Sequence, residues 1–215
     1  MQRIKDLLAD PKPITWLFYG DSITHAATHT FGQRDYTQLF HERVRFEMSR
    51  MMDVVINTAI SGNNTQQLLD SFDHRVTRFK PDVVFLMIGM NDCSSNNNWT
   101  LEKFIANLHK LCDKFQALGS LAVLQTTCPI LPNSSPDREP NIPSYMQAIR
   151  DVATQRNLPL VDHTAYWEDH ADKSYYWMSN EFHPNAHGHR AFAKWLFSEM
   201  GIWEPQSPTC QLMIP

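Results

Sequence analysis

Short apolar segments alternate with longer amphipathic segments along the whole chain. The apolar segments predict five strands, at residues 14–19, 54–56, 83–88, 121–124 and 158–161. Residues 83–88 contain no polar position, which is typical of a strand buried on both faces. Apolar positions at helical spacing predict five helices between and after these strands, at residues 37–49, 64–79, 100–118, 145–156 and 186–200.

This alternation predicts an α/β protein in which helices cover both faces of a parallel sheet. We therefore expect a single three-layer α/β/α domain over residues 1–215, built on a five-stranded parallel sheet. Residues 203–215 contain three prolines and show no period, so we expect an irregular C-terminal tail. Parallel sheets bind ligands beyond the carboxyl ends of their strands. The segments that follow the strands are therefore the first place to look for chemistry.

The composition narrows the class of protein. A chain of 215 residues can bury a core without disulfides or a metal. The formal net charge of −4 offers no basic excess to a phosphate backbone, which argues against a nucleic-acid partner. The four cysteines show no CxxC spacing, the first residues lack the apolar core of a leader peptide, and no apolar run is long enough to span a bilayer. We expect a cytoplasmic protein without a membrane partner, and its oligomeric state stays open.

A candidate nucleophile follows the first predicted strand, where the chain reads Gly20-Asp21-Ser22. A serine at a strand-to-helix turn can point its hydroxyl out of the sheet, and the following helix N-terminus favours developing negative charge. The same tripeptide also fits an ordinary helix-capping turn. The tripeptide alone therefore does not establish a nucleophile.

Three further segments carry groups that would complement such a serine. Gly62 follows the second strand and can expose a backbone N–H, while Asn91 follows the third strand and can offer a side-chain amide. His183 precedes Pro184 and the last helix, and proline favours an extended backbone in the residue before it, as in a loop that presents a base. Each feature alone fits a common turn. Together they fall at four places that a parallel sheet brings to one edge.

The sequence resembles the SGNH hydrolases, also called the GDSL esterase/lipase superfamily. The matching segments are GDSIT at 20–24, NTAISGNNT at 57–65 (with alanine where the family often has glycine at 59), GMND at 89–92 and HPN at 183–185. The resemblance implies a flavodoxin-like SGNH fold. We expect no cofactor and no catalytic metal, since no metal-binding motif is present. The resemblance implies Ser22 as nucleophile and His183 as general base. It also implies an oxyanion hole formed by Gly62, Asn91 and the Ser22 N–H.

One position departs from the family pattern. The family usually has aspartate three residues before the histidine, and this chain has Asn180. Asparagine can accept the imidazole N–H but carries no charge, and in serine proteases the same change costs about four orders of magnitude in rate. Three interpretations follow: a Ser–His dyad held by Asn180 or a backbone carbonyl, a carboxylate from elsewhere such as Glu181, or an inactive protein. An extended backbone would turn Glu181 away, which favours the dyad.

The sequence thus predicts a serine esterase that hydrolyses carboxylic esters through an acyl-enzyme. Its polar loops favour short acyl or acetyl esters of a sugar or another small molecule, and aromatic residues near the site could form a wall for a sugar ring: Trp99, Tyr175, Tyr176 and Trp177. One alternative is a non-catalytic binding protein with a degenerate site. Another is a metal-assisted hydrolase that uses His183, His187 and His189, although no HExxH motif accompanies them. We expect His187 and His189 to cap the last helix, and His25 and His29 to be exposed or to line the pocket.

Overall fold

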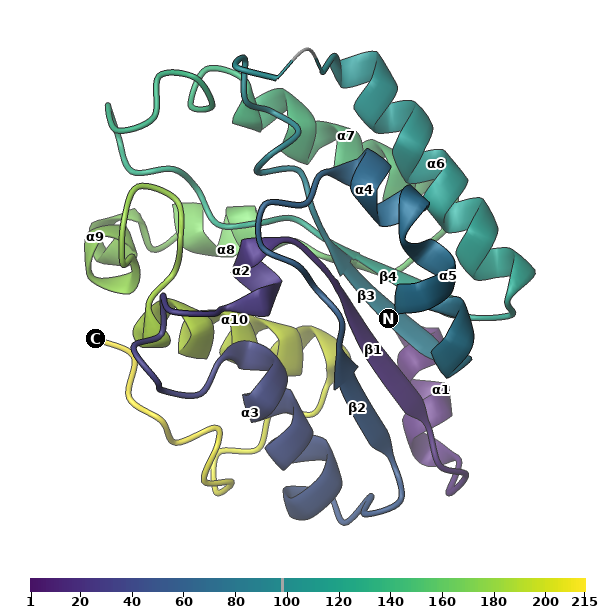
Figure 1. The fold of residues 1–215 in the computed structure, drawn as a ribbon. Coiled ribbons are helices and arrows are strands. Elements are labelled where there is room, and N and C mark those ends of the chain that lie inside the picture. The colour runs from purple at the N-terminus through teal and green to yellow at the C-terminus, as the bar shows by residue number, and fades with distance from the viewer. Residues whose placement is uncertain (98) are drawn as a thin grey trace.

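Five parallel strands form the centre of the computed structural model, which describes residues 1–97 and 99–215 (Figure 1). The strands are β1 (Thr15–Gly20), β2 (Val54–Asn57), β3 (Val83–Met87), β4 (Leu121–Gln125) and β5 (Leu160–Val161). They lie in the order β2-β1-β3-β4-β5, and every pair is parallel. The predicted α/β class and the five-stranded parallel sheet are confirmed.

The strand order determines where a ligand site can form. The chain passes from β1 outward to β2 and then returns across β1 to β3, so the connections leave β1 and β3 in opposite directions. In sheets of this order the diverging loops leave a crevice at the carboxyl ends of these two strands. Ser22 and Asn91 both follow strands that border this crevice.

Helices cover both faces of the sheet. They are α1 (Gln2–Ala9), α2 (Ser22–His25), α3 (Tyr36–Glu42), α4 (Thr65–Asp70), α5 (Phe72–Arg75), α6 (Leu101–Ala117), α7 (Ile142–Gln155), α8 (His163–Glu168), α9 (Ser174–Trp177) and α10 (Ala186–Met200). A π-helical turn spans Arg43–Glu47, and two short 3₁₀ turns span Thr77–Phe79 and Ala171–Lys173.

Two neighbouring residues of β1 show how the layers are built, because successive side chains of a strand point to opposite faces. Phe18 packs against Phe40 of α3, which in turn contacts Phe197 of α10. Tyr19 packs on the other face against Phe72 of α5. Figure 1 shows α3 and α10 together on one side of the sheet and α4 to α7 on the other. The structure therefore has the predicted helix–sheet–helix layers.

Two predicted helices are wrong in their bounds. The helix predicted over 37–49 ends as α3 at Glu42 and continues as the π-helical turn. The helix predicted over 64–79 is interrupted at Ser71. The hydroxyl of Tyr19 donates to the backbone carbonyl of Leu68, and Ser71 Oγ bonds back to the carbonyl of Gln67. Both bonds compete for carbonyl groups at the end of α4, which weakens the continuous helical ladder.

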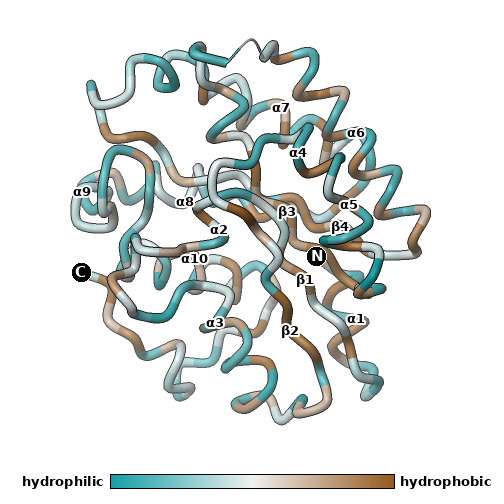
Figure 2. The backbone as a smooth tube through the Cα atoms, in the orientation of Figure 1, coloured by the Kyte–Doolittle hydropathy of each residue, from teal (hydrophilic) through white to brown (hydrophobic). Residues whose placement is uncertain are grey.

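The hydropathy of the backbone follows the same layers (Figure 2). The strands are mostly hydrophobic, whereas the loops beyond their carboxyl ends are mostly hydrophilic. Within residues 1–97 and 99–215, none of the helices combines the length and the apolar character that crossing a bilayer requires.

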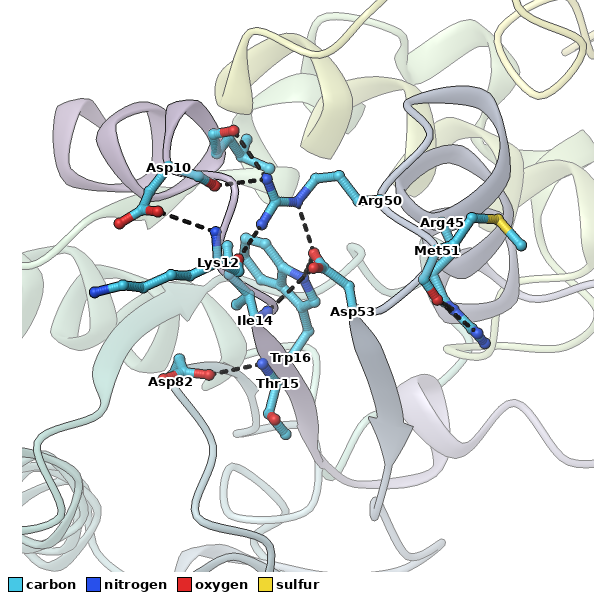
Figure 3. A network of polar contacts seen from close by, with 11 residues as sticks. Asp10, Lys12, Ile14, Thr15, Trp16, Arg45, Arg50, Met51, Asp53 and Asp82 are labelled. Atoms are coloured by element: carbon cyan, nitrogen blue, oxygen red, sulfur yellow. Dashed lines mark hydrogen bonds and ion pairs between the residues drawn. The ribbon is translucent and has the colours of Figure 1, made fainter.

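Arg50 binds the N-terminal segment at the amino ends of the strands, the edge of the sheet opposite the crevice (Figure 3). Its guanidinium donates to three backbone carbonyl groups, those of Leu8, Asp10 and Lys12. The same guanidinium pairs with Asp53 at 2.8 Å, and both side chains are nearly buried. Asp53 also accepts from the Ile14 N–H and from the indole N–H of Trp16. A single ion pair therefore joins α1, β1 and β2.

We expect Arg50→Ala to lower the free energy of unfolding by about 3 kcal/mol, because the substitution leaves the buried Asp53 carboxylate without its cation. Urea denaturation followed by circular dichroism measures the change. Arg45→Ala is the matched control. Arg45 also donates to a backbone carbonyl, that of Met51, but on the exposed side, so its loss should cost about 0.5 kcal/mol. Equal losses in the two variants would contradict the assigned role of Arg50.

Candidate active site

Ser22 lies at the turn between β1 and α2. Asp21 caps α2 by accepting from the Ile23 N–H at 3.0 Å, so Ser22 is the first residue of the helix. A Cβ on Gly20 would lie 2.2 Å from the carbonyl oxygen of Met87 on β3. Only glycine therefore allows the chain to turn this close to the neighbouring strand.

His183 reaches the serine from the other end of the chain. Its Nε2 lies 2.8 Å from Ser22 Oγ. The turn that carries His183 is closed by the Ser179 N–H, which donates to the His183 carbonyl. Asn185 then caps α10 by accepting from the first N–H groups of that helix. Ser22 and His183 are therefore fixed against each other by the two helices that begin beside them.

Asn180 lies behind the imidazole. Its Oδ1 accepts from the backbone N–H groups of Phe182 and His183, and it lies 3.0 Å from His183 Nδ1. Because two backbone donors already fix this atom as the oxygen, the third contact requires a proton on Nδ1. Nε2 then carries the lone pair that faces Ser22. The Glu181 side chain is exposed, and its backbone carbonyl accepts from the Leu131 N–H.

The environment keeps His183 neutral. Its pKa is lowered to about 4, mainly by burial and then by the positive charges of a protonated His29 and of Arg138. Arg138 lies with its guanidinium carbon 4.6 Å from the ring centroid of Phe182, next to His183 in the chain. An imidazole that accepts a proton from a serine must be unprotonated beforehand. This pKa meets that requirement at neutral pH.

The loop that follows β2 lies against the serine turn. The Ile60 N–H donates to the Gly20 carbonyl, and the Asn63 N–H closes a turn onto the Ile60 carbonyl. Gly62 has a φ of +83° within this turn, a conformation that favours glycine. Asn91 Nδ2 donates to the Asn63 carbonyl at 2.9 Å. Both predicted oxyanion donors therefore belong to one hydrogen-bonded unit with the end of β1.

Asp92 holds the end of the loop that follows β2 through Thr65, a role that the sequence did not reveal. Its carboxylate accepts from both the backbone N–H and the hydroxyl of Thr65, and Asn107 Nδ2 also donates to that hydroxyl. Burial raises the pKa of Asp92 to about 6, and burial raises that of Asp21 to about 7. Two largely desolvated carboxyl groups therefore underlie the serine turn and the loop beside it.

The other histidines match their predicted roles only in part, and His25 is exposed as predicted. His29 stacks on His183, with ring centroids 3.7 Å apart and planes 6° from parallel. The prediction that His189 caps the last helix is wrong, since His189 is fully buried against Tyr36 and Asn185 makes the cap. His187 lies beside Arg190 instead. Across the residues that the structure describes, no group of three or more His, Cys, Asp or Glu side chains is arranged to hold a metal ion.

The five-stranded parallel sheet and its helix layers match the fold of the SGNH hydrolases. The chain belongs to the GDSL-like lipase/acylhydrolase family, whose sequence model matches residues 18–191, from β1 into α10. The protein is accordingly a carboxylic ester hydrolase.

Two curated relatives align with the chain. An acetylxylan esterase of Geobacillus stearothermophilus is 25% identical over 206 residues, which cover 86% of this chain and 93% of that protein. An uncharacterized protein of Mycoplasma pneumoniae is 37% identical over 113 residues, which cover 51% of this chain but only 13% of the length of that protein.

Solved structures share the fold. An acetyl-xylooligosaccharide esterase from Geobacillus superposes with a TM-score of 0.76 at 22% identity, over 87% of this chain and 94% of that one. An α/β hydrolase from the metagenome of Lake Arreo in Spain superposes with a TM-score of 0.77 at 22% identity, over 90% and 99% of the two chains. A GDSL-like lipase from Parabacteroides merdae gives a TM-score of 0.75 at 20% identity, over 89% and 97%.

Proposed function

We propose that the protein is a serine esterase that acts through an acyl-enzyme. His183 Nε2 takes the proton of Ser22 as Oγ attacks the ester carbonyl carbon. The oxyanion of the tetrahedral intermediate accepts hydrogen bonds from the N–H groups of Ser22 and Gly62 and from the Asn91 amide. The alcohol leaves with the proton from His183. Water, deprotonated in turn by His183, then releases the acid from Ser22.

The observation that carries this proposal is the orientation of His183. The 2.8 Å contact between Nε2 and Ser22 Oγ has the length of a hydrogen bond, and the donors around Asn180 Oδ1 leave the lone pair on Nε2. A degenerate binding site has no need to keep its imidazole neutral and in this tautomer. The geometry therefore favours an active dyad over the non-catalytic alternative.

The comparison proteins support the same roles. Structures of the Geobacillus acetylxylan esterase include catalytic mutants in which a serine, a histidine or an aspartate three residues before that histidine is replaced. In this chain Asn180 stands three residues before His183, so the amide occupies the place of that carboxylate. Asn180 can fulfil the orienting part of the role but not the electrostatic part.

We further propose a short acyl ester, first of all an acetyl ester of a carbohydrate, as the substrate. The acetylxylan esterase is the relative that aligns over most of both chains. Polar groups lie near the dyad: the charge of Arg138 acts on His183, and the Asn91 carbonyl accepts from Asn97 Nδ2. Tyr175 and Tyr176 of α9 are exposed and available to a sugar ring, whereas Trp177 is buried in the core.

Acetate release from acetylated xylooligosaccharides tests the substrate class, with p-nitrophenyl acetate and p-nitrophenyl octanoate as acyl-length probes. We expect kcat/KM for the acetate ester to exceed that for the octanoate ester about 10-fold or more, because polar walls offer a long chain no apolar burial. Turnover should persist in the presence of a chelator. A preference for octanoate would contradict the acyl length, and loss of activity on chelation would favour the metal-assisted alternative.

We expect Asn91→Ala to lower kcat/KM for p-nitrophenyl acetate about 100-fold, because one of three oxyanion donors is lost. The loss should appear in kcat rather than KM, since the donor acts on the oxyanion that forms in the transition state. Gln147→Ala serves as the control, since Gln147 is an exposed amide of α7 that donates to Asp151 of the same helix. Equal effects of the two substitutions would contradict an oxyanion role for Asn91.

A further inference from the structure

The segment between α2 and α3 places a second imidazole on His183. Three of its residues, Ala26, Thr28 and Phe31, have φ values of 58°, 70° and 52°. Left-handed backbone of this kind costs free energy for a residue with a side chain, and such strain is found preferentially at functional sites. The contact that this segment achieves is the parallel stack of His29 on His183 at 3.7 Å.

The position of His29 is fixed from a second side. Its Nδ1 lies 3.2 Å from Ser179 Oγ, and the Ser179 hydroxyl in turn bonds to the His183 carbonyl. The ring of His29 is therefore tied to the same turn that carries His183. Burial lowers the pKa of His29, so its ring is neutral at neutral pH. His29 thus presents an uncharged π face to the imidazole that receives the serine proton.

The π face of His29 lies against the ring on which a positive charge develops during the proposed reaction. When His183 takes the proton of Ser22 it becomes an imidazolium, and in a triad a carboxylate would stabilise that cation. Here Asn180 offers only a carbonyl dipole, and the nearby Arg138 cation opposes the charge. A protonated His29 would oppose it as well, but burial lowers the pKa of His29 and the neutral ring exerts no such repulsion. A cation held against the face of an aromatic ring is attracted by its quadrupole, most strongly where water is excluded.

We propose that His29 is a positioning residue that stabilises the imidazolium form of His183 through this stack and so supplies part of what the missing carboxylate would provide. The inference rests on the proposed function, in which Ser22 transfers its proton to His183. It extends that function by assigning a role to a residue outside the serine, histidine, asparagine and oxyanion groups.

The test compares three side chains at position 29 that differ in their π face. Phe retains the face, Leu covers the imidazole without one, and Ala leaves it open. For hydrolysis of p-nitrophenyl acetate we expect His29→Phe to keep kcat within about threefold of the parent, and His29→Leu and His29→Ala to lower it about 10-fold. His74→Leu makes the same change at an exposed histidine of α5 and is the control that should leave kcat unchanged.

The same variants in an Asn180→Asp background show whether His29 compensates for the absent charge. With a carboxylate at position 180, the loss of kcat caused by His29→Leu should shrink to about threefold or less. Two groups that stabilise the same imidazolium have effects on the rate that do not simply add. Equal losses in both backgrounds, or a Phe variant as impaired as the Leu variant, would overturn the proposal and indicate a packing role.

An NMR titration of the His183 ring gives a readout that does not depend on turnover. We expect the pKa of His183 to be lower in His29→Leu than in His29→Phe, with Ser22, Asn180 and Arg138 facing the ring unchanged in both. Identical pKa values would overturn the stack as a source of stabilisation. An enzyme that lacks Ser22-dependent turnover but shows the pKa difference would refute the proposed function and leave the role of the stack intact.

Discussion

Ser22→Ala is expected to lower the turnover of p-nitrophenyl acetate about 10,000-fold or more, the largest effect of any substitution proposed for this protein. In the proposed mechanism the Ser22 oxygen forms the acyl bond, and it lies 2.8 Å from His183 Nε2. Once Oγ is removed, only water can attack the ester. The remaining rate would come from binding and the oxyanion donors.

Two measurements separate this loss from a folding defect. The variant should keep the circular dichroism spectrum and unfolding midpoint of the parent, because Ser22 Oγ bonds to the part-buried His183 side chain and its loss removes a single atom. Ser198→Ala is the matched control, since Ser198 is exposed and its hydroxyl donates to the Lys194 carbonyl of its own helix. Mass spectrometry of quenched parent enzyme should show an acetyl group on Ser22. Turnover by Ser22→Ala at the parent rate would refute the mechanism.

The sheet and the convergence of the site could be predicted because they depend on simple geometry. Apolar segments at strand length and helices between them leave few arrangements other than a parallel sheet. Parallel strands end at one edge, so the groups after β1, β2 and β3 had to lie near one another. The pairing of Ser22 with His183, which lie 161 positions apart in the chain, was implied by the resemblance to the SGNH hydrolases.

The features that escaped prediction depend on tertiary contacts. The break after α4 arises because Tyr19, from the sheet, takes the carbonyl of Leu68. The stack of His29 depends on left-handed turns at residues such as Thr28, for which the sequence gives no signal comparable to a glycine. The burial of Asp92 was hidden because an Asn-Asp pair after a strand also fits a simple turn. Its place in the GMND segment was the available signal.

The role of Asn180 lay between these two cases. The sequence showed that a charge was missing but could not show which atom of the amide faces the imidazole. That orientation is decided by two backbone N–H groups in the turn, those of Phe182 and His183. Because Oδ1 is the shared acceptor, Asn180 selects the productive tautomer in spite of its neutrality. What the chain lacks relative to a triad is charge alone.

Asn180→Asp should therefore raise kcat for p-nitrophenyl acetate about 100- to 1,000-fold at pH 8. In serine proteases the opposite change costs about four orders of magnitude, partly through the wrong tautomer, which this site already avoids. The carboxylate keeps the three donors that now bond to Oδ1 and adds a charge that stabilises the imidazolium. Asn157→Asp makes the same chemical change at an exposed position between α7 and β5 and should leave kcat unchanged.

The pH profile gives the same substitution a second signature. Because its pKa is lowered to about 4, His183 stays an unprotonated base as the pH falls. Protonation of His183 should therefore lower the kcat/KM of the parent only near pH 4. A carboxylate at position 180 raises that pKa, so this fall in kcat/KM moves to higher pH. The pKa values of Asp21 and Asp92 are raised to about 7 and about 6, and any change in kcat/KM that their titration causes should occur at the same pH in both proteins. The change that shifts between the two pH profiles therefore belongs to His183. A gain in rate without such a shift would mean that the new carboxylate acts elsewhere than on the imidazole.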